Sequence, residues 1–248
     1  KCEQHKGPKM LHHGDCLQVM KDIPDKSVQM VLADLPYGTT QCKWDTEIDL
    51  DALWSHYLRI CAGPIVLFAQ TPFDKKLGMS QIGLLKYEWI WEKSHPTGHL
   101  NAKRQPMKAH EDLLVFYGKQ PNYQPIKTTG HVRKAATKRN DKTPVYGKQD
   151  FAPTTYDSTE RYPRSVLQFP SDKQRSKLHP TQKPVALCRY MIRTYTNQGD
   201  TVLDNVMGSG TTGVAAALEG RKFIGIEKED NFFQIATSRL AKPLDKIA

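Results

Sequence analysis

The segment that most constrains the fold is residues 201–230, TVLDNVMGSGTTGVAAALEGRKFIGIEKED. It has the pattern of a short apolar strand, a glycine-rich turn, an alanine-rich helix and a second apolar strand that ends on an acidic residue. Gly208 and Gly210 allow a sharp turn and a close approach to a ligand, and a helix that begins at Thr211 presents free N–H groups there. The pattern predicts an α/β sheet with a nucleoside-cofactor site at its strand ends.

Two acidic residues indicate which ligand this turn favours. Glu227 ends the second strand about twenty residues after the turn, where a carboxylate can accept hydrogen bonds from both ribose hydroxyls. Asp204 ends the first strand, where its charge would repel a pyrophosphate but suits a cationic amino-acid group. A phosphate-binding loop would need a lysine after the second glycine, whereas GSGTTG also fits a dinucleotide site or a turn that serves only helix packing. S-adenosylmethionine, which carries an ammonium and a sulfonium, is the favoured ligand.

A second turn follows another apolar run, VQMVLA, and consists of Asp34, Leu35, Pro36 and Tyr37. An exocyclic base amine is a poor nucleophile, and two acceptors on its N–H bonds favour a more pyramidal nitrogen as charge develops. The Asp34 carboxylate and the Leu35 carbonyl are candidates for these acceptors, and Pro36 would restrain that carbonyl. Tyr37 offers a flat face for a base taken out of its stack. The alternative is an ordinary strand-ending turn, because Asp, Pro and Gly all favour turns.

The basic residues of the chain are concentrated in one segment. The net charge is +10, and residues 93–177 hold 17 Lys and Arg against 7 Asp and Glu, so the whole excess lies in this segment. Tyrosine and phenylalanine are interleaved with the basic residues, a mixture that suits phosphates and stacked bases. A merely solvated surface is the alternative. The candidate DNA-binding residues are Lys103, Arg104, Arg133, Lys134, Lys138, Arg139, Arg161 and Arg164.

Apolar periodicity divides the chain into two regular regions and a less regular one. Residues 1–93 and residues 179–248 alternate short apolar runs with helical patterns. Residues 94–178 are rich in polar residues and surround one strand near 111–119, which is expected to return to the core sheet. We predict an α/β core in two halves with basic insertions between them.

Three motifs in this order resemble those of the β class of DNA amino-methyltransferases. They are HHGDCLQVMKDIPDKSVQMVLADLPYG, HPTQKPVAL and VLDNVMGSGTTGVAAALEGRKFIGIE, and HPTQKP is specific to this group. The resemblance extends over about two thirds of the chain. It implies a doubly wound, mostly parallel seven-stranded sheet with permuted motif order, S-adenosylmethionine as methyl donor, and a target-recognition region where the basic segment lies.

The resemblance also implies roles for single residues. Asp34 matches the catalytic acidic residue, Leu35 the backbone carbonyl acceptor, and Tyr37 the stacking ring. Asp15 and Cys16 match the pair beside the adenine of the cofactor, where Asp15 accepts from the amino group. The other residues that match cofactor-binding motifs are Asp34, His179, Thr181, Gln182, Lys183, Asp204, Gly208, Ser209, Gly210, Thr211 and Glu227. Of the segment expected to close over the cofactor, Thr181 and Lys183 are the expected direct contacts.

Two departures from the family pattern need an account. Leu35 replaces the first proline of the usual Asp-Pro-Pro-Tyr; the carbonyl survives, so activity is expected to survive with a less rigid turn. Asn205, Val206 and Met207 replace the usual Pro-Phe and a small residue, so the loop lacks an aromatic ring that would pack against the donor. Neither departure removes a functional group that the chemistry needs.

The choice of acceptor follows from the first residue of the tetrapeptide. In this family an acidic residue there goes with N6 of adenine and serine with N4 of cytosine, so Asp34 favours adenine. Methylation at C5 of cytosine needs a cysteine nucleophile, usually after proline, and none of the five cysteines follows a proline. Methylation of cytosine N4, an RNA or protein acceptor, and a non-enzymatic DNA-binding module remain the alternatives.

The remaining features indicate the setting of the protein. Histidine and cysteine spacing predicts no metal site, and the five scattered cysteines fit reduced thiols. The N-terminal stretch lacks a signal-peptide core and no segment is apolar enough to cross a bilayer, so we expect a cytoplasmic protein of a bacterial or phage-infected cell. A homodimer is left open. The sequence implies no cognate nuclease and does not give the recognition site. Trp89 and Trp91 are predicted to be core residues on alternate faces of a strand, and Trp44 is assigned to a loop near the target pocket.

Overall fold

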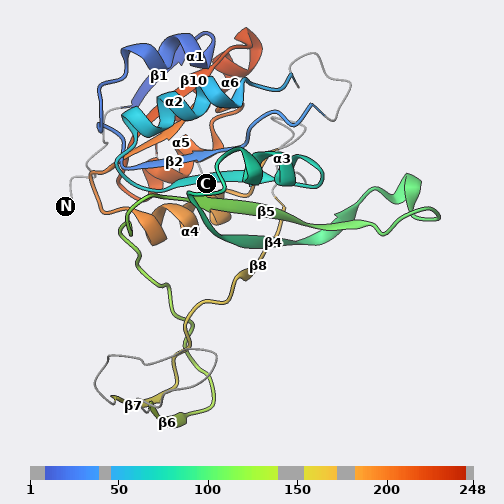
Figure 1. Cartoon of the computed structure of the whole chain (residues 1–248), viewed down its shortest axis with the longest axis vertical. Helices are drawn as coiled ribbons and strands as arrows, with labels where there is room; N and C mark the ends of the chain where they lie inside the picture. Colours follow the sequence, from blue (N-terminus) through green and yellow to red (C-terminus); the bar gives the residue numbers. More distant parts are fainter. Residues whose placement is uncertain (1–8, 39–45, 139–153, 172–181, 244–248) are drawn as a thin grey trace. The chain divides into compact units, whose positions relative to one another are not determined.

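A computed structural model of the chain describes residues 9–38, 46–138, 154–171 and 182–243. The chain divides into two units, one formed by residues 1–124 with 165–248 and the other by residues 125–164. Figure 1 shows the elements of both units. The larger unit carries the central sheet, and the smaller one carries a separate two-stranded ribbon.

Within the described residues, the larger unit is built on one eight-stranded sheet with the strand order β1-β10-β9-β2-β3-β5-β4-β8. The strands are β1 (Lys9–His13), β2 (Met30–Ala33), β3 (Ile65–Ala69), β4 (Leu85–Thr97), β5 (Lys108–Phe116), β8 (Val166–Phe169), β9 (Thr201–Asp204) and β10 (Lys222–Glu227). All neighbours pair in parallel except β5, which is antiparallel to β3 and to β4. The predicted mostly parallel sheet is therefore confirmed. It has eight strands rather than seven, because β8, from the basic segment, pairs with the outer edge of β4.

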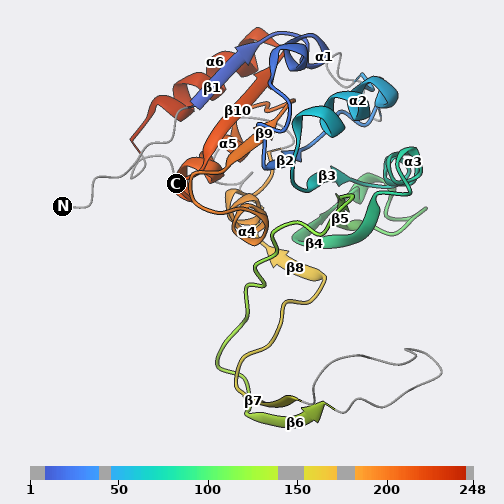
Figure 2. The ribbon, with the colours of Figure 1, turned by 60° about the vertical axis from the view of Figure 1, so that its left-hand side comes forward.

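Helices cover both faces of this sheet, as a doubly wound fold requires (Figure 2). One face carries α1 (Cys16–Val19), α2 (Leu50–Ile60) and α3 (Phe73–Ser80), with the short 3₁₀ helix η1 (Met20–Asp22). The other face carries α4 (Val185–Tyr195), α5 (Thr211–Leu218) and α6 (Asp230–Ala241). Because both faces are covered, β2 and β3 are buried along their whole length, which explains their continuous apolar sequences.

The helix that follows the tetrapeptide shows how the sequence pattern sets the packing. In α2 the buried residues are Leu53, Trp54, Tyr57 and Ile60, one face of a 3.6-residue repeat. Its N-cap is Asp49, whose side chain accepts hydrogen bonds from the first turn. The helix therefore presents an apolar face to the sheet and begins at a side-chain cap.

The segment predicted as an insertion over residues 94–178 is divided in the structure. The strand predicted near 111–119 is β5, which returns to the sheet between β3 and β4, as expected. β4 continues to Thr97, so β4 and β5 extend past β3 as a two-stranded ribbon (Figure 1). A 3₁₀ turn, η2 (His99–Asn101), lies in the connection at the end of this ribbon. Residues 125–164 form the smaller unit, in which β6 (Lys134–Lys138) and β7 (Thr154–Ser158) pair antiparallel.

Trp89 and Trp91 are core residues, with 4% and 2% of their surface exposed, but the expected alternate faces are wrong. Residues two apart in a strand point to the same face, and both indoles donate from that face, to the Tyr195 hydroxyl and to the Phe169 carbonyl. Within the described part of the chain, no helix is long and apolar enough to cross a membrane.

Candidate functional site

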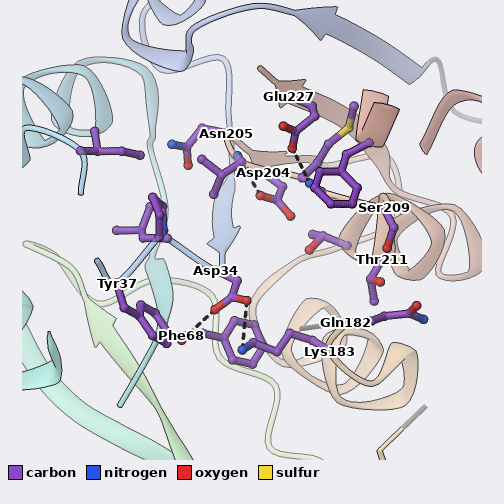
Figure 3. A pocket seen from close by; sticks show the side chains of 18 of the residues that line it. Asp34, Tyr37, Phe68, Gln182, Lys183, Asp204, Asn205, Ser209, Thr211 and Glu227 are labelled. Atoms are coloured by element: carbon purple, nitrogen blue, oxygen red, sulfur yellow. Dashed lines mark hydrogen bonds and ion pairs between the residues drawn. The ribbon is translucent and has the colours of Figure 1, made fainter. Parts of the chain in front are cut away.

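The carboxyl ends of β2, β9 and β10 border one cavity of about 640 Å³ (Figure 3). Three sequence motifs that lie far apart in the chain meet there. The predicted residues that line the cavity are Asp15, Cys16, Asp34, Leu35, Pro36, Tyr37, Gln182, Lys183, Asp204, Gly208, Ser209, Thr211 and Glu227. The parallel strands bring these residues together because their carboxyl ends lie at one edge of the sheet.

The tetrapeptide leaves β2 directly and places its carboxylate in the cavity. Asp34 Oδ1 accepts a hydrogen bond of 2.7 Å from the Tyr37 hydroxyl, and the Tyr37 ring stacks on Phe73 at 5.0 Å between centroids. Leu35 is 3% exposed and packs in the hydrophobic core, so its side chain anchors the turn where the family has a proline. Two different contacts therefore hold the turn, one polar and one apolar.

A buried ion-pair chain connects Asp34 to two residues that the sequence analysis missed. Lys183 Nζ lies 3.0 Å from Asp34 Oδ2 and 2.7 Å from Glu111 Oε2, and Lys93 Nζ lies 2.6 Å from Glu111 Oε1. Lys183 also lies 5.1 Å from the centroid of the Phe68 ring. A signal for Glu111 was present, since a charged residue that begins an apolar run such as EDLLVF must be paired when it is buried.

These contacts set the charge state of the site. Burial raises the pKa of Asp34, the nearby Lys183 lowers it, and Glu111 raises it again. Burial also raises the pKa of Glu111, but its ion pairs with Lys183 and Lys93 outweigh burial and lower the pKa to about 2. The two carboxylates keep the pKa of Lys183 above its ordinary value although burial opposes this. Two carboxylates and two ammonium groups thus balance one another.

The glycine loop has the backbone conformation that its sequence predicts. Gly208 and Gly210 both have positive φ, +50° and +78°, a region that favours glycine. The Glu227 side chain closes the loop, because Glu227 Oε2 accepts from the Gly208 N–H at 2.8 Å and Oε1 accepts from the Glu229 N–H at 2.8 Å. Gly210 itself does not line the cavity, whereas Ser209 and Thr211 on either side of it do.

Asp204 is a buried carboxyl group of the cavity with a strongly raised pKa. It is 4% exposed, and its Oδ1 accepts a hydrogen bond of 3.2 Å from the Val206 N–H. Burial raises the pKa of Asp204 to about 7, and its hydrogen bonds from Thr212 and Val206 only partly oppose this rise. The negative charge of Asp204 is therefore poorly compensated, and a ligand with a cationic group would compensate it.

Three other expected cofactor residues, Asp15, Cys16 and Gln182, line the same cavity. Asp15 caps α1, where its Oδ1 accepts from the Leu17 N–H at 3.0 Å, and Cys16 is buried, which raises the pKa of its thiol. Gln182 is 4% exposed, and its Oε1 has no hydrogen-bond partner among the residues that the structure describes. His179 and Thr181 lie outside the described residues.

The candidate DNA-binding residues differ in how they are engaged. Lys103 and Arg104 are exposed in the connection between β4 and β5. In the smaller unit, Arg133 is exposed and makes a bidentate ion pair with Asp157, with both N–O distances at 2.8 Å. Arg161 is half-buried, and its guanidinium donates to the carbonyls of Val132, Ser158 and Glu160 and to the Tyr156 hydroxyl.

Four further candidates complete this set. Lys134 and Arg164 are exposed. Lys138 ends β6, and Arg139 lies outside the described residues, as does Trp44.

Over the described ranges, no group of three or more His, Cys, Asp or Glu side chains is placed to hold a metal ion.

Comparison with known proteins identifies the class of this fold and site. The DNA methylase family profile, which covers N6 and N4 methylases, matches residues 28–238. DNA adenine methyltransferase YhdJ of Escherichia coli (strain K12) is 28% identical over 249 residues, which cover 94% of this chain and 82% of that protein. Type II methyltransferase M.HinfI of Haemophilus influenzae is 25% identical over 257 residues, covering 92% and 67%.

Solved structures show the same relationship. The M1.HpyAVI–SAM complex superposes with a TM-score of 0.64 at 25% identity, covering 94% of this chain and all of that one. The PvuII DNA methyltransferase, which is cytosine-N4-specific, shares the fold with a TM-score of 0.66 at 17% identity, covering 98% of this chain and 90% of that one. The chain therefore belongs to the β-class DNA amino-methyltransferases, the family of S-adenosylmethionine-dependent enzymes that methylate adenine N6 or cytosine N4 in DNA.

The residues of the cavity fit S-adenosylmethionine. Its volume lies within the range of about 300–1,000 Å³ that is usual for small-molecule sites. The poorly compensated Asp204 suits a cationic group, and Gln182 Oε1, which has no partner in the described part of the chain, offers a buried acceptor to a ligand donor. Asp204 ends the strand that leads into the glycine loop, which the family resemblance assigns to the methionine end of the cofactor.

Proposed function

We propose that this protein methylates N6 of adenine in a specific duplex DNA sequence, after the target base has been flipped out of the helix. The observation that carries the proposal is the Asp34 carboxylate at the end of β2, inside the cavity that also holds the predicted cofactor residues. An acidic residue at this position is the family feature that goes with adenine, and the similarity to a protein named DNA adenine methyltransferase supports the same choice.

The chain's own residues hold the reacting amine. S-adenosylmethionine supplies an electrophilic methyl group bonded to a sulfonium. Asp34 and the Leu35 carbonyl accept the two N–H bonds of the amine, which favours a nitrogen whose lone pair is free to react. Tyr37, whose hydroxyl is held by Asp34 and whose ring is supported by Phe73, provides the stacking face for the flipped base. Catalysis then depends mainly on position, since no covalent intermediate with the protein is needed.

Cofactor binding is assigned to residues on both sides of the cavity. We assign the ribose hydroxyls to Glu227, the adenine to Asp15 and Cys16, and the cationic amino-acid end to Asp204 with the glycine loop. Glu227 keeps acceptor capacity after its two backbone hydrogen bonds, because an ionised carboxylate offers about four lone-pair sites. His179, Thr181 and Gln182 are assigned to the segment that covers the cofactor.

The DNA-contacting surface is assigned first to the β4–β5 ribbon. Its strand β4 contributes Lys93, His95 and Thr97 to the cavity and then continues into the connection that carries Lys103 and Arg104. Residues 93–110 include no acidic residue. A basic ribbon that continues from the cavity is suited to bind phosphates on either side of a flipped nucleotide. Arg161 is a weaker candidate for DNA contact than its basic charge suggests, because its guanidinium already donates to three backbone carbonyls.

Base analysis of methylated DNA tests the proposal directly. DNA from cells that express the protein is expected to contain N6-methyladenine at one sequence motif, found by sequencing modified bases and by chromatography of nucleosides. Asp34→Asn should lower the rate by about 100-fold or more while S-adenosylmethionine binding stays measurable by calorimetry. Asp51→Asn, an exposed carboxylate on α2, is the control and should leave both unchanged.

The outcomes separate the alternatives. N4-methylcytosine in place of N6-methyladenine would establish the second specificity that the family covers. Transfer of labelled methyl groups to RNA or protein but not to DNA would overturn the proposal. An active Asp34→Asn variant would show that the amine is held elsewhere.

A further inference from the structure

We propose that Glu111 is a positioning residue that, supported by Lys93, draws Lys183 away from full engagement with Asp34 and so leaves that carboxylate available to the target amine. The inference rests on the proposed function, in which Asp34 accepts a hydrogen bond from the target amine. It also changes the expected role of Lys183, which the family resemblance implies to be a direct contact of the cofactor.

The geometry shows four charges in alternating order. From Asp34 the chain runs to Lys183 at 3.0 Å, then to Glu111 at 2.7 Å, and then from Glu111 to Lys93 at 2.6 Å. The four residues come from four places in the fold. Asp34 follows β2, and Lys183 precedes the N-cap of α4. Glu111 lies on β5 and Lys93 on β4. The side chains of Lys183, Glu111 and Lys93 are only 9–10% exposed, whereas Asp34 is 25% exposed. The open end of the chain is therefore the catalytic carboxylate.

Glu111 competes with Asp34 for the Lys183 ammonium. An isolated Lys183–Asp34 pair in a cavity would place the ammonium directly on the carboxylate, where it would compete with the N–H groups of the substrate. Glu111 Oε2 is closer to Lys183 Nζ than Asp34 Oδ2 is, so the ammonium is shared in favour of Glu111. Lys93 in turn compensates the other oxygen of Glu111, which would otherwise be a buried carboxylate with one partner.

The aromatic surroundings hold the ammonium in this position. Lys183 Nζ lies 5.1 Å from the Phe68 ring centroid and 5.8 Å from that of Tyr37, distances at which a cation is attracted by a ring. Lys183 is thus held by two carboxylates and two rings, an arrangement that leaves its position well defined.

Three other titratable groups lie near Asp34. Tyr37 donates to Asp34 from the same turn, Asp204 stands at the end of β9, and Cys188 lies on α4. Burial keeps the pKa of the Tyr37 hydroxyl and of the Cys188 thiol above their ordinary values, so both are neutral at physiological pH. Asp204 is the group that titrates near neutrality, and its effect on Asp34 is common to all the variants below.

Opposite charge changes on either side of Asp34 should move its titration in opposite directions. Glu111→Gln removes a negative charge and should lower the pKa of Asp34, whereas Lys183→Gln removes a positive charge and should raise it, each by about one pH unit. Lys183→Arg keeps the charge and should stay near the wild-type value. A residue that served only packing would move neither titration in a charge-dependent direction.

The first measurement is a ¹³C NMR titration of the aspartate carboxyl groups in the full chain without DNA, with Asp34 assigned through Asp34→Asn. Asp112→Asn is the matched control, since Asp112 is the neighbour of Glu111 on β5, is similarly buried at 8% exposure, and does not line the cavity. Asp112→Asn should leave the pKa of Asp34 at its wild-type value. Equal titrations in the Glu111→Gln, Lys183→Gln and wild-type proteins would overturn the inference. If Glu111→Gln does not fold, Lys93→Gln tests the same coupling and should raise the pKa of Asp34.

The second measurement is the single-turnover rate of methyl transfer at saturating S-adenosylmethionine as a function of pH. Glu111→Gln should lower the rate about tenfold and shift its acidic limb to lower pH, with the dissociation constant of S-adenosylmethionine within about twofold of wild type. A loss confined to cofactor affinity would overturn the inference. A wild-type protein that transfers no methyl group to DNA would instead overturn the proposed function, and the NMR titration would still decide whether the four charges are coupled.

Discussion

The side chain of Glu227 accepts a hydrogen bond from the backbone N–H of Gly208, with 2.8 Å between Glu227 Oε2 and Gly208 N. The two residues are nineteen positions apart, at the end of β10 and in the turn after β9. A single carboxylate therefore fixes the glycine loop and lines the cavity as well. Its loss should affect both the shape of the loop and the ligand that the loop holds.

Glu227→Gln is expected to weaken S-adenosylmethionine binding by about 10- to 100-fold, because the amide keeps only one acceptor oxygen for both tasks. Calorimetry measures the dissociation constant. Glu88→Gln, an exposed carboxylate on β4, is the control and should bind as the wild type does. Unchanged affinity in Glu227→Gln would place the ribose elsewhere.

The raised pKa of Asp204 should make the stability of the ligand-free protein fall, and the affinity for the cofactor rise, as the pH increases. Because its folded pKa of about 7 is raised above the usual 3.8, the folded protein retains a proton that the unfolded chain has released. This group's contribution to stability is complete below pH 4 and is lost as the pH rises toward 7, by at most about 4 kcal/mol. Denaturant unfolding of the ligand-free protein across this range measures the slope, which Asp204→Asn should reduce.

S-adenosylmethionine should bind more tightly as the pH rises through 7, since ionised Asp204 attracts a cationic group and the protonated form does not. The dissociation constant measured between about pH 6 and pH 8 should fall in the wild type and change less in Asp204→Asn. The same pH dependence in both proteins would contradict this assignment.

Leu35 is expected to contribute to stability through its side chain and to catalysis through its backbone. Its side chain is 3% exposed in the core, whereas its proposed catalytic group is the backbone carbonyl. Leu35→Ala should lower the free energy of unfolding by about 2–4 kcal/mol through the cavity it leaves. The rate of methyl transfer per folded molecule should stay within a few-fold of wild type. A large loss of rate at full folding would show that the side chain also shapes the active turn.

Lys103 and Arg104 test the basic ribbon. Replacing both by alanine should weaken DNA binding and make its salt dependence shallower by about 2 in the slope of log K against log salt, because each phosphate contact contributes about 0.9. Fluorescence anisotropy with a short duplex at several salt concentrations measures the slope. Lys222→Ala is the control, because Lys222 is exposed at the beginning of β10, which lies near the opposite edge of the sheet from β4. An unchanged slope would move the DNA contacts to the other basic residues.

The motifs with strong local causes were predictable from the sequence. Gly208 and Gly210 are glycines because the turn needs positive φ, and the buried β2 and β3 are continuous apolar runs because both their faces are covered. The strand within the basic segment was also recognised from its apolar run, and it is β5. Such features depend on neighbours in the chain, so their patterns can be recognised before the fold is known.

The sequence by itself thus determined the doubly wound sheet, the cofactor turn with Glu227, and the candidate acceptor Asp34. Only the tertiary structure decided that Lys183 pairs with Asp34 and that Glu111 and Lys93, from strands β5 and β4, complete the chain of charges. It also decided that β8 joins the sheet as an eighth strand. The reason is physical: these ion pairs and the edge-strand pairing depend on contacts between residues about 20 to 150 positions apart, and no local periodicity records such contacts.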